Sequence, residues 1–320
     1  MGDEILPPDM QAALDQFDNA AENIIAGFVG PLDTQKPPSL IYHYTGDLGL
    51  RGILESGKLW LTDIFGLNDP SELTHGFDIS VHILRAMAEG GPPEHAVFAK
   101  HFAAFRESGV QESAHYFVCS LSAHADELGQ WRAYADDGRG YALVFDGQAL
   151  EDAFTKEGDK PIRNNATFPV TYDDALASGL QRQIIERALT LVSMPRGRNM
   201  QSKPLHSYMK ELSISLTLHA LRTGLFFKHT GYINEKEYRF LQIFPADVPA
   251  PEVLIRSRPY SLVRYREFDW RAKAPGALKK VIVGPGADKQ KAFQFAADCL
   301  RFFHSEKVEI GFSKIPYRAG

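Results

Sequence analysis

The sequence predicts an α+β fold with a mixed, largely antiparallel sheet and flanking helices. Segments of β type outnumber helical segments, and the two kinds do not alternate strictly, as they would in a doubly wound fold. Turns are frequent, because 19 prolines and 26 glycines are spread over 320 residues. The hydrophobic content of 44% is ordinary for a globular protein, and the chain is long enough to bury a substantial core.

The N-terminal segment is expected to stand apart from the rest of the chain. Residues 1–38 read as a helix and a proline-rich connector, and residues 39–320 as a single α+β domain with a helical insertion around residues 174–230. The first helix of this domain has Asp47 as an expected N-cap and Gly57 as an expected left-handed residue at its end.

The other elements follow from periodicity along the chain. Strands are predicted at residues 39–45, 58–63, 115–121, 140–146, 166–172, 235–244, 262–268, 280–284 and 307–312. Helices are predicted at residues 71–106, interrupted by the Gly-Gly-Pro-Pro of residues 90–93, and at residues 126–135, 174–192, 203–222 and 288–303.

Charge and cysteine content restrict the class of protein. The formal net charge of −5 argues against a generic nucleic-acid binder, whose affinity comes from Lys and Arg, but it allows a local basic patch. Cys119 and Cys299 lie in apolar contexts and are not spaced as in a zinc site or a disulfide framework. The sequence shows neither a signal peptide nor an apolar run near the ~20 residues of a membrane span. We therefore expect a cytoplasmic protein without membrane contact.

Two basic segments stand out from this background. Residues 193–203 contain Arg196 and Arg198 and lack periodicity, which is typical of a loop. Residues 256–280 carry the second basic run. The favoured interpretation of that run is a solvated face of two strands, unless both segments converge on one cleft.

A histidine lies between two tyrosines in the first strand, within YHYT. Alternation along a strand sends His43 and Thr45 to one face and Tyr42 and Tyr44 to the other. A buried polar pair needs hydrogen-bond partners from the protein or from a ligand. From these residues alone, a core histidine with satisfied hydrogen bonds is the favoured interpretation.

The strand NEKEYRFLQIF carries two glutamates and an arginine on one face, namely Glu235, Glu237 and Arg239. One interpretation is a surface charge cluster, which contributes little stability. The other is a carboxylate held on a rigid element at the rim of a cleft, with Arg239 steadying it.

The segment CSLSAHADELGQWRAY combines two serines with a helix. Trp131 and Tyr134 lie three residues apart, so they share a helix face, and such a face is more often core than ligand platform. The sequence contains no HExxH, CxxC or Walker A motif, so no metal is expected. The GPGADK of residues 284–289 could cradle a phosphate at a helix start, although an ordinary turn explains it as well.

The motifs taken together resemble a bacterial family known as domain of unknown function 2971. They are YHYT, GILESGKLWLTD, LNDPSE, SLS with GQWRAYADDGRGYALVFD, EKEYRFL and VIVGP, in this order over roughly residues 42–286.

More distantly, a strand with His-x-Thr followed by a helix ending in ILESG resembles the opening of the ADP-ribosyltransferase fold, of diphtheria-toxin type and of the DNA-modifying DarT enzymes. This resemblance implies a split sheet, NAD as substrate, and contact of His43 and Thr45 with the adenosine ribose. It implies a catalytic glutamate at the start of a late strand, where Glu237 and Glu235 are the matching residues, with His43 as a further catalytic candidate.

The resemblance also implies an aromatic residue that stacks on nicotinamide and basic residues that hold the diphosphate. The aromatic candidates are Tyr134, Trp131, Tyr44 and Trp60, and the basic candidates are Arg239, Arg196 and Arg198. The aromatic position of the family cannot be aligned to one of the four.

The leading hypothesis is an NAD-dependent ADP-ribosyltransferase-like enzyme or NAD glycohydrolase, with protein, nucleic acid or water as acceptor. It expects His43 and Glu237 in one cleft. A second hypothesis is a non-catalytic ligand-binding or interaction module in bacterial defence or regulation. A third is a nuclease or phosphodiesterase that uses His43 with the serines of CSLS.

Overall fold

The chain divides into two compact units. The computed structural model describes residues 6–33, 36–67, 71–104, 114–193, 203–245 and 252–318. Unit 1 consists of Met1–Thr34, Asn68–Ala114 and Thr171–Thr230, and unit 2 consists of Gln35–Leu67, His115–Val170 and Gly231–Gly320. The N-terminal helix therefore shares a unit with the helices expected around residues 174–230, a grouping that the sequence did not suggest.

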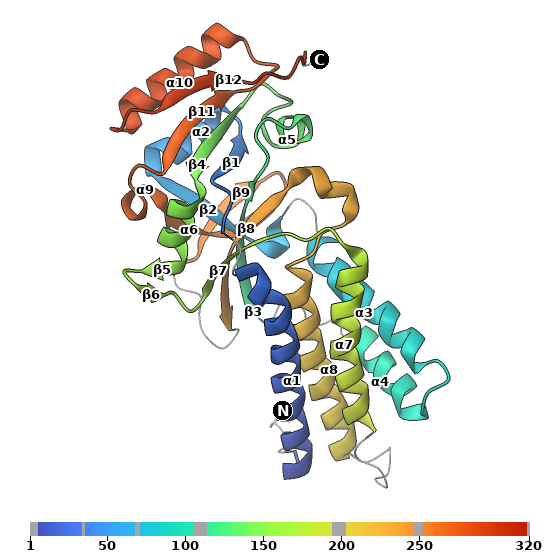
Figure 1. The fold of residues 1–320 in the computed structure, drawn as a ribbon. Coiled ribbons are helices and arrows are strands. Elements are labelled where there is room, and N and C mark those ends of the chain that lie inside the picture. The colour runs from blue at the N-terminus through green and yellow to red at the C-terminus, as the bar shows by residue number, and fades with distance from the viewer. Residues whose placement is uncertain are drawn as a thin grey trace. The chain divides into compact units, whose positions relative to one another are not determined.

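Unit 1 is built from long helices (Figure 1). They are α1 (Pro8–Asp33), α3 (Ser71–Ala88), α4 (Pro93–Ala104), α7 (Asp174–Val192) and α8 (Lys203–Gly224). Both α1 and α3 pack against α7 and α8, and α4 packs against α3 and α8. The stripe of α7 that includes Leu180, Ile184 and Leu191 is buried, as expected for apolar residues at helical spacing. None of the helices in the described ranges is long and apolar enough to cross a bilayer.

Unit 2 contains a largely antiparallel sheet. Its strands are β1 (Leu40–Thr45), β2 (Lys58–Asp63), β3 (Ala114–Ser122), β4 (Tyr141–Asp146), β7 (Asn165–Pro169), β8 (Glu237–Pro245), β9 (Leu254–Arg258), β10 (Ser261–Asp269), β11 (Leu278–Val283) and β12 (Glu309–Phe312). The order is β12-β11-β4-β1-β3-β2-β10-β9, and β8 pairs with β3 and β7. A separate small sheet joins β5 (Lys156–Glu157) to β6 (Lys160–Pro161). The predicted α+β class is confirmed.

The two faces of the large sheet carry different side chains, and each is named here by its residues. One face carries Ile41, Leu61 and Leu143 and packs against four helices, and we call it the core face. These helices are α2 (Asp47–Ser56), α6 (Gly147–Thr155), α9 (Trp270–Lys273) and α10 (Lys289–Phe303). The other face carries Tyr42, whose cross-strand partner is Ser122, and we call it the serine face.

Strand β3 is the centre of the sheet because three strands pair with it. Strand β1 pairs at one end, through Tyr42 and Ser122, and β2 pairs at the other end, through Thr62 and Val118. Ser120 lies between these two pairings. Since alternate residues share a face, Ser120 lies on the serine face together with Ser122 and Val118.

Local signals placed most boundaries correctly. Gly57 has φ 70°, a left-handed conformation that favours glycine, and it ends α2 as predicted. The N-cap of α2 is Gly46 rather than Asp47, which is the first helical residue. The sequence prediction did not include α6, which begins directly after β4 and is capped by Asp146, or β9, whose polar residues hide its alternation.

Candidate functional site

A carboxylate, a guanidinium and a hydroxyl meet on the serine face. The hydroxyl of Ser120 donates to Oε1 of Glu237 at 2.6 Å. Arg239 donates from Nε to the same oxygen at 2.6 Å and from Nη2 to Oε2 at 3.3 Å. Bidentate guanidinium contacts fix the plane of a carboxylate as well as its charge. We call Ser120, Glu237 and Arg239 the carboxylate cluster.

The carboxylate cluster combines deep burial with one accessible member. Glu237 is 5% exposed and Arg239 is fully buried, whereas Ser120 is exposed. Burying an ion pair costs desolvation free energy that the mutual attraction often only balances. The ion pair thus contributes little net stability. Ser120 is the member of the cluster that solvent or a ligand can contact.

His43 contacts the backbone of Ser120, whereas Glu237 contacts its hydroxyl. Its ring forms a hydrogen bond with the backbone of Ser120. Its cross-strand partner is Leu143, so its side chain leaves the strand on the core face, whereas Glu237 contacts Ser120 on the serine face. The prediction that His43 and Glu237 converge on one cleft is therefore wrong, because alternation along paired strands sends the two side chains to opposite faces of the sheet. Desolvation by surrounding protein atoms lowers the pKa of His43 to about 4, although part of the residue is accessible. His43 is therefore neutral at pH 7 and supports the backbone of Ser120.

The two glutamates of NEKEYRFL have different surroundings. Lys236, between them, has φ 44°, a conformation that costs a non-glycine residue roughly 1–2 kcal/mol. This turn joins the 3-10 helix η4 (Thr230–Glu235) to β8. Glu235 is partly exposed, and the hydroxyl of Tyr134 donates to its Oε1 at 3.1 Å. Tyr134 is itself 41% exposed, so this pair forms an accessible rim.

Two of the four aromatic candidates are part of the scaffold. Trp131 is fully buried and donates from Nε1 to Asp126 at 2.8 Å. Tyr44 packs edge-to-face on Trp131 with ring centroids 4.9 Å apart, and its hydroxyl donates to the backbone oxygen of His124 at 3.0 Å. The rings of Trp131 and Tyr44 are therefore enclosed. Tyr134 and Trp60 are the two candidates with exposed ring surface.

Thr45 packs against the first turn of α2. A methyl group added to Gly49 would lie 1.8 Å from the Thr45 hydroxyl oxygen, so glycine is required there. Arg196 and Arg198 lie outside the described residues. The start of α10 is occupied by its own N-cap, because Asp288 accepts from the backbone amide of Lys291. An ordinary turn therefore accounts for GPGADK.

Among the described residues, no group of three or more histidine, cysteine, aspartate and glutamate side chains is placed to hold a metal ion. Cys119 and Cys299 are both buried free thiols.

The sequence prediction named Ser120 only as one of the two serines of the nuclease hypothesis, and not as a partner of Glu237. The local signal for Ser120 was the Ser-x-Ser spacing on a strand, which puts Ser120 and Ser122 on one face. Ser122 has a structural part, because its hydroxyl donates to the backbone oxygen of Glu235 at 2.6 Å. Neither serine hydroxyl has a described hydrogen bond to the ring of His43, so the geometry does not form a histidine–serine relay.

Comparison with known proteins gives a family without an assigned activity. Residues 130–240 match the model of a protein family of unknown function, DUF2971, which confirms the predicted family resemblance over that segment. The matched segment ends just after Glu237 and Arg239 and therefore includes both. No curated protein and no solved structure matches the chain.

Proposed function

We propose that the chain is an NAD-dependent ADP-ribosyltransferase-like enzyme in which Glu237 is the catalytic carboxylate. The observation that supports this most is the contact between Ser120 and Glu237 at the centre of the sheet, 117 residues apart in sequence. A carboxylate held by a hydroxyl and a guanidinium keeps one orientation without rearranging during a reaction.

The reaction breaks the bond between the ribose C1′ and the nicotinamide nitrogen, which leaves with the bonding electron pair. Positive charge then develops on the ribose ring. Glu237 stabilises this charge and binds the ribose 2′-hydroxyl, because a fixed negative group is most effective where charge appears in the transition state. The acceptor oxygen or nitrogen forms the new bond to C1′ and releases its proton to a carboxylate or to water.

The remaining candidates take supporting parts in this proposal. Ser120 and Arg239 position Glu237, and His43 positions Ser120 through its backbone. Glu235 and Tyr134 form the accessible rim, where the hydroxyl of Tyr134 fixes the orientation of Glu235. An acceptor nucleophile or the nicotinamide ring would contact this rim.

A non-catalytic binding module is the second candidate, and one observation favours it. Glu237 and Arg239 form a buried ion pair whose atoms already bind one another. Such a pair can serve as a rigid structural support for a ligand that contacts only Ser120 and the rim of Glu235 and Tyr134. This candidate predicts nucleotide binding without release of nicotinamide.

Release of nicotinamide from NAD separates the two candidates. The full chain is incubated with NAD and with mixed nucleic-acid and protein acceptors, and wild type is compared with Glu237→Gln and Ser120→Ala. We expect Glu237→Gln to lower the rate by about 100-fold or more, and Ser120→Ala by about 10-fold because the carboxylate keeps its arginine.

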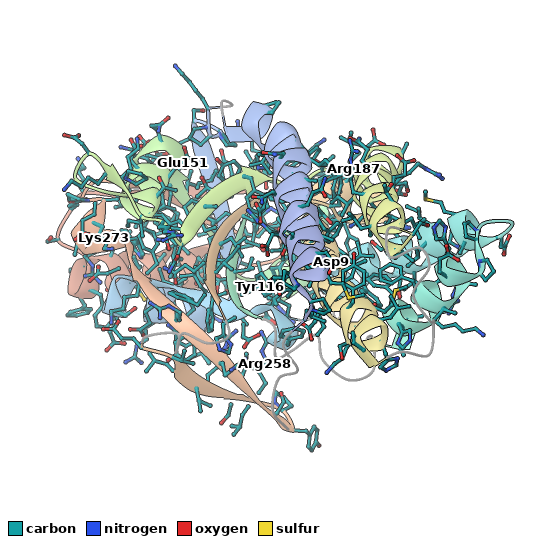
Figure 2. The ribbon with its side chains drawn as sticks, turned by 90° about the horizontal axis from the view of Figure 1, so that it is seen from below. Asp9, Tyr116, Glu151, Arg187, Arg258 and Lys273 are labelled. Carbon is teal, nitrogen blue, oxygen red and sulfur yellow. The ribbon has the colours of Figure 1, made fainter. Side chains whose placement is uncertain are left out.

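Glu151 provides a matched control on α6, where it is labelled in Figure 2. Its carboxylate accepts hydrogen bonds from the hydroxyls of Thr167 and Tyr238, as Glu237 does from Ser120. Glu151→Gln should therefore leave the rate unchanged. Equal release by wild type and Glu237→Gln, with both proteins folded by circular dichroism, would exclude Glu237 as the catalytic carboxylate.

A further inference from the structure

An aromatic pair with one exposed member, Trp60, lies on the serine face of β2 and β10. Trp60 is 43% exposed, whereas its neighbours Leu59 and Leu61 are buried on the core face. The ring of Tyr265 lies 4.5 Å from that of Trp60, centroid to centroid. Tyr265 is the cross-strand partner of Thr62, so register fixes it on the same face as Trp60.

Arg256 on β9 completes this surface. Its guanidinium carbon lies 5.0 Å from the Trp60 ring and 6.0 Å from the Tyr265 ring, and its Nη2 donates to the Thr62 hydroxyl at 2.9 Å. We call Trp60, Tyr265 and Arg256 the stacking platform. These contacts hold the guanidinium plane in place against the rings, in the arrangement of a cation–π pair.

The described residues provide no carboxylate that pairs with Arg256. Arg264, further along the hairpin, pairs with Asp63 at 2.6 Å, but Arg256 has no carboxylate partner among the described residues. Burial and the nearby Arg258 lower the pKa of Arg256, as expected for a cation without a counterion. Glu267, the cross-strand partner of Trp60, forms an ion pair with Lys58. Among the described residues, the platform therefore presents a cation without an ion-pair partner beside an exposed ring.

The platform and the carboxylate cluster share one face of the sheet. Thr62, which binds Arg256, is the direct cross-strand partner of Val118, and Ser120 lies two residues further along the same strand. Diagonal neighbours of this kind have Cα atoms roughly 7–8 Å apart. A bound molecule that stacks on Trp60 can thus extend toward Ser120 and Glu237.

The hairpin of β9 and β10 prolongs the platform in the other direction. Arg258, labelled in Figure 2, lies two residues beyond Arg256 on the same face. At the tip, Tyr260 is fully exposed and has φ 60°, a conformation that an aromatic residue rarely adopts. Arg256, Arg258 and Tyr260 therefore follow one another along the hairpin at intervals of two residues.

We propose that the stacking platform binds single-stranded nucleic acid, with a base stacked on Trp60 and a phosphate at Arg256. Stacking on aromatic rings combined with a positively charged track is how proteins bind single strands without reading sequence. Exposed bases are required, because bases inside a duplex have no free ring face. The inference rests on the proposed transfer reaction in one respect: the bound strand is then the acceptor that Glu237 serves.

Binding is measured without NAD, so that it does not depend on the transfer reaction. The probe is a fluorescently labelled mixed-sequence single-stranded oligonucleotide, followed by anisotropy against the full chain, with the same sequence as a duplex for comparison. We expect Trp60→Ala to weaken single-strand binding by about 10-fold or more, as loss of one stacked base does. Arg256→Ala should weaken it and reduce the slope of log affinity against log salt by about 0.7.

The control variants come from a similar pair elsewhere. On α10 the guanidinium of Arg301 lies 4.6 Å from the exposed Phe302 ring, but Arg301 is paired with Asp298. Phe302→Ala and Arg301→Ala should leave the affinity unchanged. Trp60 can also be read directly, because the other two tryptophans, Trp131 and Trp270, are buried. Single strands should quench the fluorescence of wild type and not that of Trp60→Phe.

Three results would overturn the proposal. They are wild-type affinity in both Trp60→Ala and Arg256→Ala, binding of duplex as tightly as of single strand, and displacement of the oligonucleotide by NAD at equal concentration. The last result would assign the platform to the dinucleotide. Platform-dependent binding by a chain that releases no nicotinamide would support this inference and reject the transfer reaction alone.

Discussion

Each unit buries a polar cluster, and the two clusters differ in charge. In unit 1, the Gln181 side chain accepts from the hydroxyl of Ser80 at 2.6 Å and donates to the backbone oxygen of Ala220 at 3.2 Å and to the hydroxyl of Thr223. In unit 2, Glu237 and Arg239 form an ion pair that Ser120 joins. One cluster is neutral and enclosed, and the other is charged and has an exposed member.

The difference indicates what each cluster is for. A neutral amide that satisfies its hydrogen bonds costs little to bury and specifies how helices pack. An ion pair gains little net stability in the same position, and apolar residues of similar volume often do as well. Packing alone thus explains Gln181, whereas the carboxylate cluster has the burial and charge that the catalytic role proposed for Glu237 requires.

The largest effect is expected from breaking the ion pair. Arg239→Met removes the guanidinium that pairs with the buried carboxylate of Glu237. We expect the free energy of unfolding to fall by about 3–5 kcal/mol, the usual result of removing one partner of a buried ion pair. Urea denaturation monitored by circular dichroism measures this loss.

A double variant tests the cause of that loss. In Glu237→Gln with Arg239→Met neither charge of the ion pair remains, and the glutamine amide can still bind Ser120. Most of the lost stability should return. A double variant as unstable as Arg239→Met would show that the loss comes from packing rather than from charge.

The titration of His43 gives the next largest effect. Its pKa is about 4 in the folded protein and near 6.5 in an unfolded chain. Between these values the unfolded chain binds more protons, so stability is lost as pH falls from 6.5 towards 4, by at most about 3 kcal/mol. Denaturation at several pH values measures the slope, and His43→Gln should remove this component. A His43 ring that titrates near 6.5 by NMR would contradict the expectation.

The smallest effect is expected in unit 1. Gln181→Leu removes the amide, but the hydroxyls of Ser80 and Thr223 still donate to Gly76 and Ala220 of their own helices. The expected loss is about 1–2 kcal/mol, because the hydroxyls keep a partner. Urea denaturation again measures it, and a loss as large as that of Arg239→Met would remove the contrast between the clusters.

Sequence reasoning identified the charged part of the site but not its assembly. Period-two alternation correctly put Glu237 and Arg239 on one face of β8, because side-chain direction in a strand is a local property. It could not show that Ser120 contacts Glu237, because nothing local encodes a pairing between β3 and β8. The same limit applies to Arg256. The sequence predicted it to be part of a solvated basic run, and only the pairing of β9 with β10 fixes its neighbours.

The sequence alone determined the α+β class, most element boundaries and the left-handed turn at Gly57, because these depend on neighbours along the chain. Only the tertiary structure decided which candidates are enclosed and which are accessible. Tyr44 and Trp131 pack on each other, whereas Trp60 keeps an exposed ring beside Arg256. Burial depends on what packs over a residue, and that is fixed by contacts between segments far apart in sequence.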